Sequence, residues 1–108
     1  MNPIETFEKM LASGQDNDML RFTLGNAYFT AKDFTVAAEH FAKAVAHNKE
    51  YSAAWKMLGR SYASLEQHAQ ALTAFDAGMA VAAKNGDKQT EKEITVFRKR
   101  VLKQLDTD

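Results

Sequence analysis

Apolar residues recur at steps of three and four along most of the 108-residue chain. The clearest stripes are Phe34, Ala37, Ala38, Phe41 and Val45 and, further on, Leu72, Phe75 and Met79. This spacing is typical of amphipathic α-helices, and no segment alternates in the way that a half-buried strand would. The pattern therefore predicts an all-α protein.

Residues that end and begin helices fall between these stripes. Gly14 can end a first helix, and Asp33 is a good N-cap for a later one. The run Asn85-Gly86-Asp87 can stop one helix and cap the next. The only proline, Pro3, is at a position that a first helical turn tolerates. We therefore expect about six helices, near residues 3–13, 17–31, 33–47, 52–65, 68–84 and 88–105.

One block of sequence occurs twice. The block Leu24-Gly25-x-x-Tyr28 returns 34 residues later as Leu58-Gly59-x-x-Tyr62. The same offset relates Ala37 to Ala71 and Phe41 to Phe75. This period indicates a helical-hairpin repeat, in which neighbouring units bury a shared core and leave one face free for a partner.

The residue types within the repeat have a physical explanation. Glycine inside a helix costs about 1 kcal/mol relative to alanine. We interpret Gly25 and Gly59 as positions where a side chain would push neighbouring helices apart. The aromatic residues at the other repeated positions, such as Phe41 and Phe75, are large enough to fill the space between helices.

The motif Leu-Gly-x-x-Tyr followed by Ala-x-x-x-Phe at this period resembles the tetratricopeptide repeat. The resemblance implies one domain over residues 1–108: a half-repeat helix at 3–13, repeats at 18–51 and 52–85, and a capping helix at 88–105. The implied fold is a short right-handed α-solenoid of antiparallel helix hairpins. The blocks at 20–25 and 51–56 are also similar to small stand-alone bacterial members of this family.

Four residues depart from the family pattern, at three kinds of signature position. The usual tryptophan is Arg21 in the first repeat, and a usual alanine is Gly78 in the second. The proline near each repeat end is replaced by Lys49 and Ala83. We expect these departures to change local packing more than the fold.

In arrays of this family the first helix of each hairpin lines a concave face. The resemblance therefore implies a partner-binding groove, for which we select Met19, Phe22, Asn26, Phe29, Lys56, Met57 and Arg60. We expect a peptide segment of a partner protein to bind there, with an apolar anchor near Phe22 and Phe29 and an acidic group near Lys56 and Arg60. Two alternatives stay open: the aromatic residues only pack and the basic ones only solubilise, or the same face binds a second copy of the chain.

Some tetratricopeptide proteins hold a chaperone's C-terminal carboxylate in a clamp of lysine, asparagine and arginine side chains. Asn26 matches one clamp position in this sequence. The other positions carry Phe22, Met57, Asp87 and Glu91 instead of the required residues. Binding of that type is therefore not expected.

Other functional classes have weak support in the composition. The chain has no cysteine and a formal net charge of zero, so cysteine chemistry is excluded and nucleic-acid binding is not expected. His40 and His47 lie too far apart on one helix to share a metal, and we expect surface histidines. The charged N-terminus and the lack of a long apolar run predict a soluble cytoplasmic protein with no membrane segment. We expect no cofactor and no enzymatic activity.

The packing interpretation predicts a large effect of removing either repeated phenylalanine. Phe41→Ala and Phe75→Ala should each lower the free energy of unfolding by roughly 3–5 kcal/mol, because each leaves a cavity in the core. Thermal and urea denaturation measure this change. A shift of the melting temperature by only a degree or two for either variant would contradict the packing interpretation.

Overall fold

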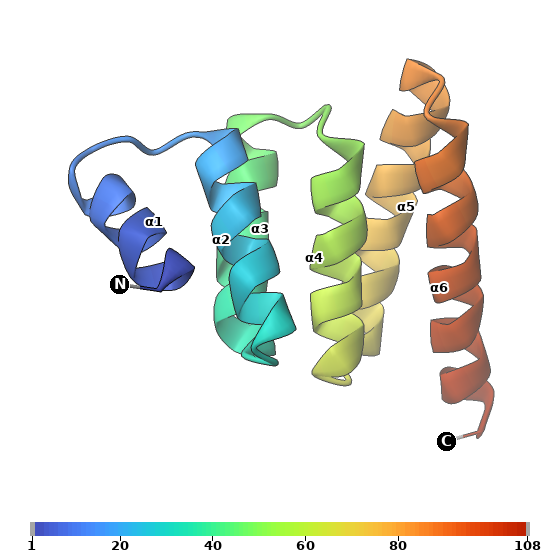
Figure 1. Cartoon of the computed structure of the whole chain (residues 1–108). Coiled ribbons are helices and arrows are strands. Elements are labelled where there is room, and N and C mark those ends of the chain that lie inside the picture. The colour runs from blue at the N-terminus through green and yellow to red at the C-terminus, as the bar shows by residue number, and fades with distance from the viewer. Residues whose placement is uncertain (1, 108) are drawn as a thin grey trace.

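The computed structural model describes residues 2–107, which form six α-helices and no strand (Figure 1). The helices are α1 (Pro3–Ala12), α2 (Asp18–Thr30), α3 (Phe34–His47), α4 (Ser52–Ser64), α5 (His68–Asn85) and α6 (Lys88–Thr107). Every bound lies within two residues of the range expected from the sequence. The prediction of an all-α fold is therefore confirmed.

The helix ends follow from local chemistry. The side chain of Asn17 accepts a hydrogen bond from the backbone N–H of Leu20 at 2.8 Å and so caps α2. Gly86 ends α5 in the left-handed conformation, with a φ of 73°. The turns inside the two hairpins use a non-glycine residue with positive φ at the same repeat position, Lys32 (φ 64°) and Glu66 (φ 59°).

The hairpins stack side by side in two layers (Figure 1). Helices α2, α4 and α6 form one layer, in which α2 contacts α4 and α4 contacts α6. Helices α3 and α5 form the other layer and do not approach each other as closely. Because the first layer is drawn together and the second is not, the surface of α2, α4 and α6 is concave, and we call it the inner face.

Each hairpin closes through a phenylalanine ring placed over a glycine. A Cβ atom on Gly25 would lie only 2.5–2.8 Å from the Phe41 ring, and one on Gly59 would lie closer than 3.0 Å to the Phe75 ring. Both phenylalanines are fully buried. The proposed reason for the repeated glycines, close approach of neighbouring helices, is therefore confirmed.

Helix α6, which the sequence predicts as a cap, packs against both α5 and α4. Its residue Ile94 is fully buried and packs against Gly78 of α5. A Cβ atom added to Gly78 would lie only 2.8 Å from the Ile94 side chain. The same Cβ would lie 2.9 Å from Trp55, so the glycine lets three helices meet. At the N-terminal end of α6, the Ser52 hydroxyl donates a 2.8 Å hydrogen bond to Asp87.

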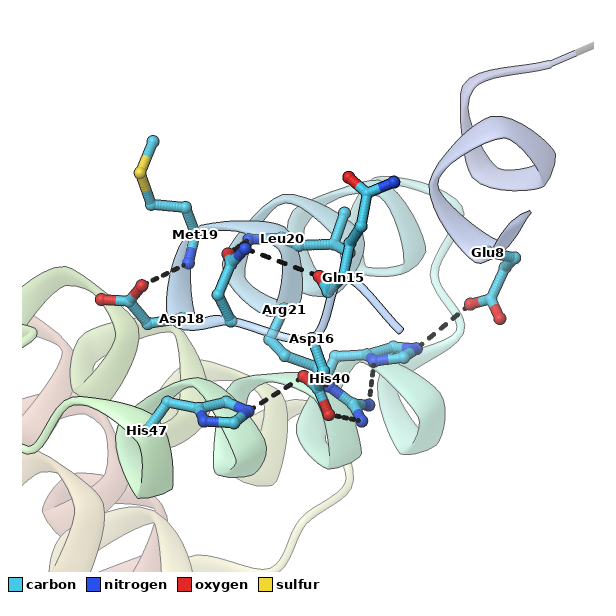
Figure 2. Close-up of polar contacts among 10 residues, drawn as sticks. Glu8, Gln15, Asp16, Asp18, Met19, Leu20, Arg21, His40 and His47 are labelled. Atoms are coloured by element: carbon cyan, nitrogen blue, oxygen red, sulfur yellow. Dashed lines mark hydrogen bonds and ion pairs between the residues drawn. The ribbon is translucent and has the colours of Figure 1, made fainter. Parts of the chain in front are cut away.

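Helix α1 packs on α2, although none of its residues is fully buried. Polar contacts help to hold it (Figure 2). A carboxylate oxygen of Glu8 lies 3.3 Å from the Tyr28 hydroxyl and 3.4 Å from His40 Nε2. Asp16, in the segment after α1, binds the Arg21 guanidinium through both of its oxygens, at 2.8 and 2.9 Å.

The expectation of surface histidines is wrong for His40, which is only 7% exposed. Its ring stacks on Tyr28, and its Nδ1 lies 3.1 Å from Arg21 Nη1. Arginine can only donate, so His40 Nδ1 accepts and the ring proton belongs on Nε2, facing Glu8. His47 is exposed, as expected, with Nε2 2.9 Å from Asp16.

The ring-on-glycine contact predicts that a better helix former will destabilise the protein. Gly59→Ala should lower the free energy of unfolding by roughly 1–3 kcal/mol, because the added methyl group displaces a buried ring. The smaller side chain of Phe75→Leu should relieve much of this cost in the double variant. Chemical denaturation of the four proteins in the cycle measures the coupling; additive effects would contradict the contact.

Burial of His40 predicts a loss of stability in mild acid. Burial lowers the pKa of His40, against the opposing effect of Glu8. Because the pKa is lower in the folded state, the contribution of neutral His40 to stability is fully present above about pH 6.5. That contribution is lost as the pH falls through the folded-state pKa. The hydrogen bond from Arg21 lowers the pKa of Asp16. The stability that ionised Asp16 contributes is therefore lost only at more acidic pH.

Urea unfolding at pH 7.5 and pH 5.5 tests this expectation. The wild-type protein should be less stable at the lower pH, and His40→Gln should show a smaller difference between the two conditions. Equal pH dependence in both proteins would assign the acid sensitivity to other groups.

Candidate partner-binding groove

The centre of the inner face is the side chain of Arg60 on α4. Its guanidinium carbon lies 4.9 Å from the centroid of the Phe29 ring on α2 and 4.5 Å from that of the Phe97 ring on α6. Arg60 therefore connects all three inner helices through cation–π contacts. Its Nη1 atom also lies 3.7 Å from the sulfur of Met57.

Two other predicted groove residues of α4 already interact with residues of the protein itself. Lys56 Nζ forms an ion pair with Glu93 of α6 at 3.3 Å, and the lysine side chain is only 16% exposed. Met57 is 8% exposed and belongs to the hydrophobic core. Neither side chain presents a large free surface on the inner face.

The predicted residues of α2 differ in their surroundings. Met19 is 70% exposed and lies in the first turn, away from Arg60. Phe22 is partly buried, with its ring centroid 4.8 Å from that of Tyr51 and 5.8 Å from that of Phe41. Asn26 is half-buried, and its amide makes no hydrogen bond to the described residues.

A cleft of about 340 Å³ opens beside Arg60, between the C-terminal halves of α2 and α4 and the second half of α6. We call it the Arg60 cleft, and its principal lining residues are Phe29, Arg60, His68, Phe97 and Arg100. Burial lowers the pKa of Arg60, and the positive charge of Arg100 adds to this effect. The cleft therefore combines aromatic walls with two guanidinium groups of like charge.

The sequence prediction missed the contribution of α6 to this face. Phe97, Arg100 and Glu93 come from the helix that was expected only to cap the array. A signal was present, because Phe97 lies 34 residues after Ala63, at the same repeat position. His68, at the start of α5, also lines the cleft, and its Nδ1 atom is buried without a hydrogen-bond partner.

In the described part of the chain, no group of three or more histidine, aspartate or glutamate side chains has an arrangement that could hold a metal ion. No helix in residues 2–107 combines the length and apolar character needed to cross a bilayer.

Paired antiparallel helices, a 34-residue period and a concave layer of first helices define a helical-repeat protein of the hairpin type. A family model described as anaphase-promoting complex, cyclosome, subunit 3 matches residues 2–78. A TPR repeat-containing protein of Pseudomonas aeruginosa is 48% identical over 98 residues, covering 91% of this chain and 93% of the relative. The chain belongs to the tetratricopeptide repeat family.

Solved structures agree with this assignment. A protein of Bordetella parapertussis, determined in solution, has a TM-score of 0.83 at 38% identity, covering 96% of this chain and 90% of that one. The first TPR of Spaghetti (RPAP3), bound to an HSP90 peptide, has a TM-score of 0.82 at 23% identity, with coverages of 95% and 77%. At that identity the second likeness supports the fold alone.

Proposed function

We propose that this protein is an interaction module whose inner face binds a peptide segment of a partner protein. The observation that carries the proposal is the guanidinium of Arg60, bracketed by two aromatic rings and without a carboxylate within 4.0 Å among the described residues. Such a group can bind an acidic side chain while the rings bind an apolar neighbour.

The proposed path of the peptide crosses α2 and α4. The unpaired amide of Asn26 is suited to a hydrogen bond with a peptide backbone, and Phe29 supplies an apolar contact beside it. Arg60 then takes the acidic group. Lys56 could share this role only by giving up its ion pair with Glu93.

The proposal includes no catalytic step, in keeping with a family of protein-interaction scaffolds. The cytoplasm is the proposed compartment, as expected from the sequence, and the relatives from Pseudomonas and Bordetella support a bacterial protein. The tetratricopeptide domains of Spaghetti and of yeast Sti1 are described in complex with HSP90 peptide and with Hsp70, respectively. HSP90 and Hsp70 are partners of Spaghetti and Sti1 only. For the present chain, the two complexes support peptide binding as the mode of recognition.

Removal of the Arg60 charge should weaken binding while the fold is retained. Arg60→Met keeps an unbranched stem between the rings but removes the guanidinium. Affinity for a peptide selected from a random display library should fall at least about tenfold, because hydrogen bonds to charged groups contribute roughly 1.5–3 kcal/mol. Calorimetric titration measures the affinity, and a melting curve checks the fold.

Arg98→Met is the matched control, because Arg98 pairs with Asp76 at 2.7 Å and does not line the Arg60 cleft. It should bind the peptide like the wild type. Equal affinity for all three proteins would refute the proposed site. If the wild type selects no peptide but sediments as a dimer that Arg60→Met dissociates, the inner face serves self-association instead.

A further inference from the structure

We propose that the Arg60 cleft is a pocket for one acidic side chain of the bound peptide, and that Arg100 of α6 is the second residue that recognises it. This inference rests on the proposed function and adds a residue that lies outside the two sequence repeats. It also defines the chemistry of the ligand at one position: an aspartate or glutamate within the peptide, next to an apolar residue.

Two positive charges lie against one aromatic ring of the cleft. The guanidinium carbons of Arg60 and Arg100 lie 4.5 and 5.4 Å, respectively, from the centroid of the same Phe97 ring. Neither group has a carboxylate within 4.0 Å among the described residues, whereas Lys56 and Arg98 are both paired. The charge of Arg100 acts on Arg60, whose pKa it helps burial to lower. A carboxylate bound beside the two guanidiniums would offset this repulsion.

His68, a residue that lines the same cleft, has a polar atom that makes no hydrogen bond within the described part of the chain. His68 Nδ1 is buried and has no hydrogen-bond partner among the described residues. Buried polar atoms in proteins are nearly always paired, so His68 has unused hydrogen-bonding capacity beside the cleft. A rotation of the ring that turned a protonated Nδ1 into the cleft would let the imidazole donate to a carboxylate oxygen.

The cleft also has a size and a lining that suit a side chain. A volume of about 340 Å³ is at the small end of the range for ligand pockets, which favours one or two side chains over a large cofactor. Phe29 and Phe97 supply apolar walls for the methylene groups of the ligand. Among the described residues that line the cleft, Glu66 alone carries a carboxylate, and it lies with an exposed side chain in the turn after α4.

The test uses random peptides displayed within a carrier protein, so that every selected sequence is internal to a chain. The wild-type protein, Arg100→Gln and Lys103→Gln are each used for selection. Arg100 and Lys103 are both exposed residues of α6, but Lys103 does not line the cleft. The wild type and Lys103→Gln should enrich an acidic residue at a fixed position, and Arg100→Gln should lose this enrichment.

Calorimetry then measures one selected peptide and its version with the acid replaced by its amide. On the wild type and on Lys103→Gln, the amide peptide should bind roughly tenfold more weakly. On Arg100→Gln, the ratio of the two affinities should fall below about twofold. Equal affinities for the acidic and amide peptides on the wild type would overturn the acidic pocket and leave peptide binding intact.

Two other outcomes also count against the inference. A full acidic preference in Arg100→Gln would assign recognition to Arg60 alone. Failure of the wild type to select any peptide would overturn both the pocket and the proposed function.

Discussion

The fold depends on the contact between a phenylalanine ring and a glycine backbone in each hairpin. Phe41 over Gly25 and Phe75 over Gly59 set how closely the two helices of a hairpin approach. Because the rings are fully buried and rigid, this distance is fixed twice along the chain, with a separation of 34 residues. Each contact fixes the shape of one hairpin, and the hairpins then stack through the core shared by α3 and α4.

The inner face gains its third helix through another glycine. Gly78 lets Ile94 approach α5 and α4, and this position of α6 brings Phe97 against the guanidinium of Arg60. The same placement gives Lys56 its ion pair with Glu93. Helix α6 thus both closes the hydrophobic core and neutralises one positive charge of the groove, while no carboxylate in the described part of the chain pairs with Arg60. The binding chemistry that we propose is a consequence of this packing.

Much of the fold could be predicted from the sequence because its signals are local or periodic. Helix ends follow from capping residues, and the ring-on-glycine contacts follow from the 34-residue repeat. The candidate site was harder to predict, since it depends on contacts between distant helices. Nothing near Lys56 in the sequence indicates Glu93. His40 is a polar residue outside the apolar stripe of its helix, so the periodicity gives no sign that it is buried. Phe97 carried a periodic signal, but the residues around it do not repeat the motif.

The most direct test of the account is a map of the bound peptide by NMR. An isotope-labelled sample would be titrated with a selected acidic peptide, and chemical shifts would be followed for backbone amides and arginine side chains. We expect the largest changes on α2, α4 and α6, centred on Asn26, Phe29, Arg60 and Arg100. Changes confined to α3 and α5, with the inner face unaffected, would contradict the account.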